Sequence, residues 1–202
     1  TCVSVFLIIL FSSMAAYIFV RKAWKINQII FMVMLFSMVI PFQVVMIPLI
    51  SIYGGTFGIL NHRATLIFMH LGFSVSMAVF MFHGFIKGGV PISLEEAAQI
   101  DGAGPIQLFF KVTIPLLTPT IFFVMITSII SGFQVFDVIY MMIGKTNPAY
   151  ANTQTVVMLF YRQAFDYGYK GYAAAISILI FAVIMLVTVI QMIGQKKWVN
   201  YD

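Results

Sequence analysis

The sequence has few charged residues, because Asp, Glu, Lys and Arg together make up only 8% of its 202 residues. A soluble domain carries about 25% charged residues. Apolar residues account for 62% of the chain, and a soluble protein of this length could not bury so much apolar surface. The composition therefore excludes an ordinary soluble domain and indicates that much of the surface faces lipid.

Cysteine and recognisable catalytic motifs are also scarce. Cys2 is the only cysteine, so the chain cannot form an internal disulfide or a cysteine metal cluster. The three histidines have no metal-ligand spacing and are interpreted as interfacial or packed side chains. No G-x-x-x-x-G-K-[ST] motif is present, so the chain cannot drive ATP-dependent transport by itself. H-E-x-x-H, a nucleophile elbow and paired intramembrane carboxylates are missing too, which disfavours a membrane-embedded enzyme.

What the sequence does contain is a series of long apolar segments. A helix needs about 20 such residues to cross the bilayer core. The five segments run over residues 2–20, 26–50, 64–86, 118–143 and 171–193. Pro41 and Pro48 are expected to break or kink the second segment. Because the chain starts directly in apolar sequence, we expect that an N-terminal portion precedes Thr1.

Basic residues at the segment ends predict the orientation. The net charge of +5 suits the positive-inside rule better than a nucleic-acid partner, and none is expected. The loops on one side carry Arg21, Lys22, Lys25, Lys87, Lys111, Lys196 and Lys197, against Arg63, Lys145, Arg162 and Lys170 on the other. The first side, which has the larger number, is predicted to be cytoplasmic.

The longest polar interruption between apolar segments spans residues 93–115 and is predicted to form a helix–turn–helix elbow at the membrane surface. Ser93 and Glu96 have the spacing of a capping box. Gly102 is placed to end the first helix, and Pro105 can start the second. By the charge distribution this elbow is cytoplasmic.

A spaced set of acidic, small, aliphatic and proline residues marks this elbow. The set comprises Glu96, Ala97, Ala98 and Gly102, followed by Val112, Ile114 and Pro115. It resembles the EAA loop of bacterial ABC-importer permeases, whose usual form ends in I-x-L-P. The flanking IDGAG and PLLTP sequences resemble the sugar-importer branch, most closely its maltose-type permease subunits.

The resemblance implies an all-α polytopic membrane protein with the type I ABC-importer transmembrane domain over residues 1–194 and a cytoplasmic tail over 195–202. It implies five membrane-spanning helices in this chain and six in the full-length protein. It implies a place in the bacterial inner or plasma membrane, a sugar substrate, and ATP and Mg²⁺ bound by a partner rather than by this chain. The expected partners are a second homologous permease, a dimer of ATP-binding subunits and a solute-binding protein. In such a subunit the elbow is the coupling helix, which enters a cleft of the ATPase.

The residues that the resemblance assigns to coupling lie in and around the EAA motif. They are Glu95, Glu96, Ala97, Ala98, Asp101, Gly102 and Pro115. Glu96 is the best candidate for a polar contact with the ATPase, although the capping box alone could explain it. Gly102 permits the turn, and Pro115 fixes the chain's return to the bilayer.

Polar residues within the apolar segments are candidates for the solute pathway, because such residues are costly in lipid and often functional. Gln134 and Asp137 continue a row that starts at Ser128 and recurs every three residues, so we expect one stripe of a single helix. Gln43 and Tyr140 are the other candidates. Asp137 could instead be a solvated charge at a helix end, and the two glutamines could bond neighbouring helices.

A secondary transporter or channel subunit is the alternative function, because a broken helix and a polar stripe would suit it too. That alternative leaves the elbow unexplained. The sequence does not name the solute, or the permease of the pair that holds the solute site.

Overall fold

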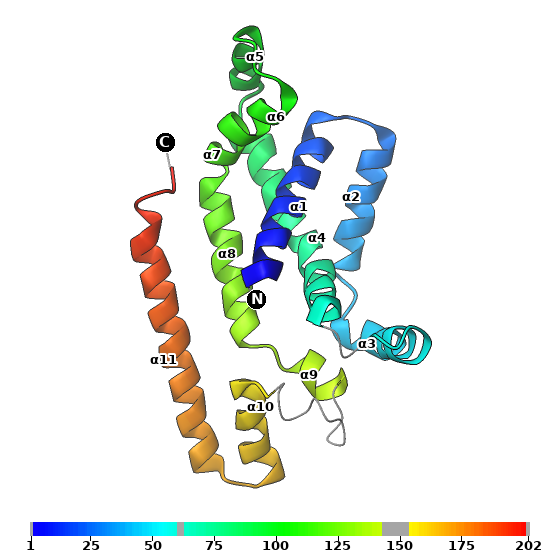
Figure 1. The fold of residues 1–202 in the computed structure, drawn as a ribbon, viewed down its shortest axis with the longest axis vertical. Helices are drawn as coiled ribbons and strands as arrows, with labels where there is room; N and C mark the ends of the chain where they lie inside the picture. Colours follow the sequence, from blue (N-terminus) through cyan, green and yellow to red (C-terminus); the bar gives the residue numbers. More distant parts are fainter. Residues whose placement is uncertain (1, 60–62, 143–153, 201–202) are drawn as a thin grey trace.

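The computed structural model describes residues 2–59, 63–142 and 154–200, and within these ranges the chain is helical without a strand. The predicted all-α fold class is confirmed. In the described part of the chain, three helices are each long and apolar enough to cross a membrane, and two bent helix pairs raise the candidate spans to as many as five. The three long helices in Figure 1 are α1 (Cys2–Arg21), α4 (Arg63–Gly89) and α11 (Lys170–Gln195).

The centre of the fold is the contact between α1 and α4, which α8 (Thr118–Phe133) joins. The facing surface of α1 carries the small buried residues Ser12, Ser13 and Ala16. Small residues let two helix backbones approach closely, which is how helices associate in a membrane. Phe82 of α4 is fully buried in this contact. The three helices form the core on which the other elements are placed.

The second predicted span is broken, as its prolines indicate. Helix α2 (Lys25–Ser37) is followed by α3 (Phe42–Ile50) and a π-helical turn, η1 (Ser51–Thr56). The two halves meet at 97°. Pro41 adopts an extended conformation as the N-cap of α3, whereas Pro48 lies inside α3 without ending it. The break therefore belongs to Pro41, whose extended backbone starts the second half in a new direction.

The elbow consists of two helical arms. The first arm is α5 (Ile92–Ile100). The second arm runs without a gap through α6 (Pro105–Leu108), the π-helical η2 (Phe109–Thr113) and α7 (Ile114–Leu116). The second arm then bends by 71° into α8.

Helix α8 ends earlier than predicted. Gln134 is its C-terminal cap, and the backbone N–H of Gln134 donates to the Ser131 carbonyl at 3.1 Å. A separate short helix, α9 (Asp137–Met142), begins three residues later. The prediction that Ser128 and Asp137 share one stripe of one helix is therefore wrong, because the backbone turns between them.

The opposite end of the molecule is formed by shorter elements. Helix α10 (Val156–Tyr161) and the π-helical η4 (Arg162–Asp166) lead into α11 and belong to the connection between α9 and α11. The first part of that connection, residues 143–153 with Lys145, lies outside the described residues, as do residues 201–202 of the predicted tail.

The loops that were predicted to be cytoplasmic gather at one end. Figure 1 shows the α1–α2 connection, the elbow and the C-terminus together at the top of the view. The C-terminal tail packs on the start of α8: the Trp198 ring lies 6.0 Å from that of Phe122, and the Asn200 backbone N–H donates to Thr118 Oγ1 at 2.9 Å. The elbow and the tail are thus neighbours.

Candidate functional site

The first arm of the elbow begins differently from the prediction. Its N-cap is Pro91, in an extended conformation with φ −62° and ψ 135°, and no side chain caps the helix. The Leu94 backbone N–H donates to the Pro91 carbonyl at 3.2 Å. The capping box of Ser93 and Glu96 is therefore not formed, because Pro91 starts the helix before Ser93. Glu96 is exposed and leaves its carboxylate available at the surface.

The turn between the arms forms at Gly102, as predicted. The Ala103 N–H donates to the Ala98 carbonyl at 2.9 Å, and the Gly102 N–H donates to the Gln99 carbonyl at 3.0 Å. These two bonds make a Schellman motif, which needs a left-handed residue just after the helix. Gly102 supplies it with φ +85°. The angle between the two arms therefore depends on this glycine.

Replacing Gly102 with alanine is expected to destabilise the turn by about 1 kcal/mol, because a Cβ disfavours left-handed backbone. The added Cβ meets no atom within 4 Å, so the effect is conformational rather than steric. Thermal unfolding of the purified protein in detergent measures it. Gly104→Ala is the matched control, since Gly104 has φ −72° and equally open surroundings. Equal losses for both variants would contradict the explanation.

The predicted coupling residues of α5 divide between two faces. Glu96, Ala97 and Asp101 are exposed, and Ala98 is half-buried. Glu95, in contrast, is one of the most buried charged residues among those described, with a relative exposure of 5%. The structure therefore places Glu95 inside the protein and Glu96 at the surface.

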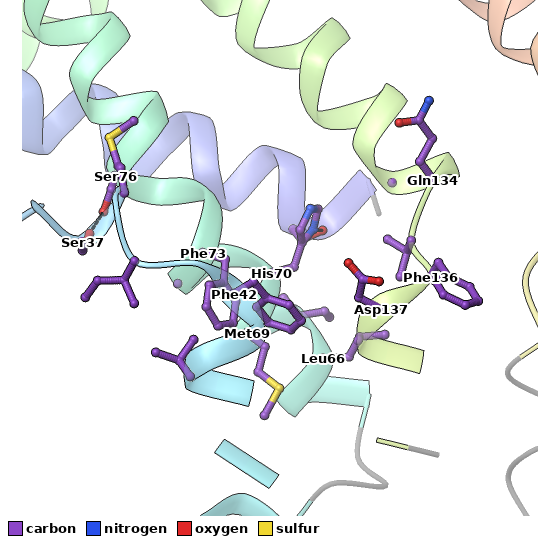
Figure 2. A pocket seen from close by; sticks show the side chains of 18 residues that line it. Ser37, Phe42, Leu66, Met69, His70, Phe73, Ser76, Gln134, Phe136 and Asp137 are labelled. Atoms are coloured by element: carbon purple, nitrogen blue, oxygen red, sulfur yellow. Dashed lines mark hydrogen bonds between the residues drawn. The ribbon is translucent and has the colours of Figure 1, made fainter. Parts of the chain in front are cut away.

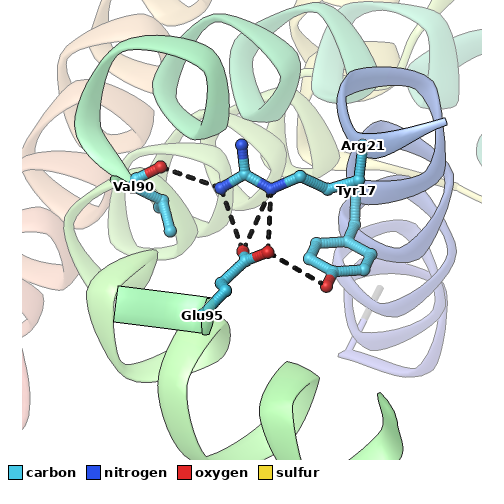
Figure 3. Close-up of polar contacts among 4 residues, drawn as sticks. All are labelled: Tyr17, Arg21, Val90 and Glu95. Carbon is cyan, nitrogen blue, oxygen red and sulfur yellow. Dashed lines mark hydrogen bonds and ion pairs between the residues drawn. The ribbon is translucent and has the colours of Figure 1, made fainter. Parts of the chain in front are cut away.

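Figure 3 shows the buried cluster that Glu95 forms with α1. The Arg21 guanidinium binds its carboxylate with Nε at 3.1 and 3.0 Å and with Nη2 at 2.9 Å. Arg21 Nη2 also donates to the Val90 carbonyl at 2.8 Å, and the Tyr17 hydroxyl donates to Glu95 Oε2 at 3.4 Å. We call these four residues the Glu95 cluster. This cluster could not be predicted from local sequence patterns, because Arg21 and Glu95 are 74 positions apart.

Pro115 lies at the end of the second arm, in the first turn of α7, and is half-buried. The Thr118 hydroxyl donates to the Pro115 carbonyl at 2.8 Å. The 71° bend into α8 follows directly. Pro115 thus sits where the chain changes direction between the elbow and the bundle.

A cavity of about 620 Å³ lies near the opposite end of α1, where helices α1 to α4 meet the α8–α9 connection. Gln134 and Asp137 both line it, so the structure brings together two of the predicted solute-pathway residues. Figure 2 shows Asp137 and His70 among the side chains that line the cavity. Gln43 is exposed on α3 and is not among the lining residues.

Two hydrogen-bonded pairs add polar groups to the cavity wall. Ser4 Oγ lies 2.8 Å from His70 Nδ1, and Ser37 Oγ lies 3.1 Å from Ser76 Oγ. Each pair joins different helices and so could not be found from local sequence patterns. With Asp137, they give an otherwise apolar cavity several hydroxyl-binding groups. Among the described residues, no three His, Cys, Asp or Glu side chains are placed to hold a metal ion.

Tyr140 lies beside the cavity rather than in it. Its ring stacks on Phe136, a lining residue, with centroids 5.2 Å apart, and its hydroxyl lies 3.4 Å from that of Tyr161. This hydrogen bond raises the pKa of Tyr161. The aromatic cluster links α9 to α10 and forms one border of the cavity.

Comparison with known proteins identifies the family of this chain. Residues 8–199 match the family described as "Binding-protein-dependent transport system inner membrane component". The chain belongs to this family. As an inner membrane component it is a multi-pass membrane protein, which agrees with its long apolar helices.

Several relatives in this family carry names of sugar permeases. The probable starch degradation products transport system permease protein AmyC of Thermoanaerobacterium thermosulfurigenes is 45% identical over 59% of this chain and 43% of its own length. The melibiose/raffinose/stachyose import permease protein MelC of Bacillus subtilis is 38% identical over 57% of this chain and 42% of its own length. The chain thus spans less than half the length of these relatives.

Proposed function

We propose that this family member is a membrane-spanning permease subunit of an ATP-driven sugar importer, and that its elbow couples a separate ATPase to the bundle. A second permease, a pair of ATP-binding subunits and a solute-binding protein complete the transporter. The observation that carries the proposal is the elbow, which combines an EAA-like motif with an exposed face on α5 that includes Glu96 and Ala97.

The exposed surface of the elbow is suited to a protein partner. Ile100 at the end of α5 is 86% exposed, and Ile106 at the start of the second arm is 75% exposed. Figure 1 shows α5 standing at the end of the molecule, beyond the helix bundle. Exposed apolar side chains beside a carboxylate are typical of a surface that docks into a cleft of a partner, and they are less typical of a free polar loop. Glu96 is the candidate for the polar contact.

The test is purification of the full-length protein from its native membrane in mild detergent, followed by identification of bound proteins and assay of ATP hydrolysis. For the wild type we expect an ATPase and a second permease to co-purify. Glu96→Ala combined with Gly102→Asp is expected to release the ATPase or to uncouple hydrolysis, since the pair removes the polar contact and strains the turn. Lys22→Ala, an exposed change outside the elbow, is the control.

The opposite result would favour the alternative function. A protein that purifies alone and moves solute without ATP is a secondary transporter or channel, and the elbow then has another role. Full retention of the ATPase and of its coupling in the double variant would contradict the assignment of Glu96 and Gly102.

The solute proposed for the pathway is a mono- or oligosaccharide, which the names of the relatives support. The cavity offers a carboxylate, serine hydroxyls and an imidazole, and these groups hydrogen-bond to sugar hydroxyls. Phe136 and Phe73 line the same space and provide apolar ring surface. Asp137 and Gln134 are therefore proposed to contact solute during passage.

Asp137→Asn is expected to lower solute transport about tenfold, because a hydrogen bond to a charged group is worth about 1.5–3 kcal/mol. Uptake into proteoliposomes containing the complete transporter measures it, with melibiose, raffinose, stachyose and maltodextrins as probes. Gln43→Ala is the control, because Gln43 is exposed outside the cavity. Unchanged transport by Asp137→Asn, or an equal loss in Gln43→Ala, would remove Asp137 from the proposed pathway.

A further inference from the structure

The Glu95 cluster joins α1 to both arms of the elbow. Glu95 on the first arm is held by Arg21 and Tyr17, which lie four residues apart and therefore on one face of α1. The Tyr17 ring also meets the ring of Phe109 on the second arm at 5.4 Å, edge to face. Phe109 is 7% exposed, so this second contact is buried as well.

The cluster also holds the chain between α4 and α5. Arg21 Nη2 donates at once to the carboxylate of Glu95 and to the backbone carbonyl of Val90, at 2.9 and 2.8 Å. A planar guanidinium held by two acceptors has a fixed orientation. The end of α1 is thereby attached to the connection that leads from the bundle into the elbow, as Figure 3 shows.

The other end of α1 reaches the cavity. Ser4 lines the cavity and is bonded to His70 of α4. Helix α1 has 20 residues without a break, so about 20–25 Å of continuous helix separates Tyr17 and Arg21 of the Glu95 cluster from Ser4. A displacement of the elbow that also displaces Arg21 must therefore move the cavity wall, because a straight helix transmits axial and tilting motion.

We propose that Glu95 is a positioning residue that attaches the coupling elbow to α1, so that α1 carries the movement of the elbow to the cavity. The inference rests on the proposed function, and it gives Glu95 a role distinct from that of its neighbour Glu96. Glu96 faces the ATPase, whereas Glu95 faces inward and passes to α1 the movement that the ATPase gives to the elbow. The movement then passes through α1 as well as through α4 and α8, which continue directly from the elbow.

The experiment reports cavity accessibility, so it does not depend on knowing the solute. The complete transporter is purified with Cys2→Ser, which removes an exposed thiol, and with Gly72→Cys as a reporter in the cavity wall. A Cβ at Gly72 meets no atom within 4 Å. The rate of modification by a charged maleimide is measured with and without ATP plus vanadate, and ATP hydrolysis is measured in parallel.

In this reporter background we expect ATP plus vanadate to change the modification rate about tenfold, within the usual range of coupling between two sites. Glu95→Gln is expected to keep the ATPase bound and hydrolysing ATP but to lose most of that change. Arg21→Lys keeps the positive charge but lacks the planar guanidinium that binds two acceptors at once. Its ATP-dependent change in modification rate is expected to lie between those of the wild type and Glu95→Gln. Glu96→Gln is expected to weaken ATPase binding instead, and Lys22→Gln is the control for a neighbouring exposed charge.

The outcomes separate the two proposals. If Glu95→Gln keeps the full ATP-dependent change, α1 is not attached through Glu95 and the inference is overturned while the proposed function stands. If the reporter protein brings no ATPase, or shows no response to ATP, the proposed function fails and the inference fails with it.

A folding defect is handled by a second variant. Arg21→Met with Glu95→Leu replaces the ion pair by apolar side chains of similar size, a change that folded proteins often tolerate. If this variant assembles and hydrolyses ATP but shows no ATP-dependent change in cavity accessibility, the inference is supported. If it assembles and shows the full change, the inference is overturned. If neither Glu95→Gln nor this pair assembles, the cluster serves folding alone and the inference is overturned.

Discussion

Replacing Arg21 with alanine is expected to lower the free energy of unfolding by about 3–5 kcal/mol, the range for a buried ion pair that loses one partner. The side chains of Arg21 and Glu95 are 13% and 6% exposed, so water cannot replace the guanidinium without opening the contact between α1 and α5. The Val90 carbonyl loses its bond to Arg21 as well. Denaturation in mixed micelles with increasing dodecyl sulfate, followed by far-UV circular dichroism, measures the change.

Two comparisons isolate the cause. Lys22→Ala removes an exposed charge next in sequence and is expected to change stability by less than about 0.5 kcal/mol. Arg21→Met with Glu95→Leu removes both charges and is expected to lose less stability than Arg21→Ala alone, since only the uncharged Val90 carbonyl and Tyr17 hydroxyl lose a partner. If Arg21→Ala alone lowers the free energy of unfolding by less than about 1 kcal/mol, other groups or water must satisfy the Glu95 carboxylate, and the explanation is contradicted.

Truncation of Phe82 to alanine is expected to be the second most damaging change, at about 3 kcal/mol, the lower end of the range for a buried phenylalanine. The lower end of the range applies because lipid is as apolar as the interior of the helix contact. Removing the ring therefore loses van der Waals packing, with little loss of the free energy of transfer from water. Phe82 is fully buried in the core cluster formed by α1, α4 and α8, so its truncation leaves a gap inside this contact.

The matched control is Phe80→Ala on the same helix. Phe80 is 48% exposed and faces away from the core, so its truncation is expected to change stability by less than about 0.5 kcal/mol. The same micelle titration compares the two variants. Equal effects would show that the α1–α4 contact does not carry the stability that its burial indicates.

Features with a local sequence cause could be predicted. The turn at Gly102 follows from the need for a left-handed residue after a helix, and the break near Pro41 follows from a fixed φ. The start of the second arm at Pro105 has the same kind of cause. Long apolar runs predicted the spans, because lipid leaves few other options for a backbone.

Features that depend on distant contacts could not be predicted. Glu95 and Glu96 are adjacent in the EAA-like motif, and only the packing of α5 on α1 shows that they face opposite ways. The end of α8 at Gln134 was missed because the apolar pattern continues through it, although the backbone turns. The pairing of Ser4 with His70 likewise needed the fold, as those residues are 66 positions apart.

The pairing of α1 with α4 also has a consequence for biosynthesis. The hydroxyl of Ser4 on α1 finds its partner His70 only after 66 further residues have been made. At about 5–20 residues per second, several seconds pass between the two. Until α4 has been made, neither this bond nor the bond from Ser12 Oγ to the Val75 carbonyl can form, so the packing of α1 is completed only when α4 arrives. Glu95 follows Arg21 by 74 positions, so the ion pair at the other end of α1 can form only after the whole of α4 has been made.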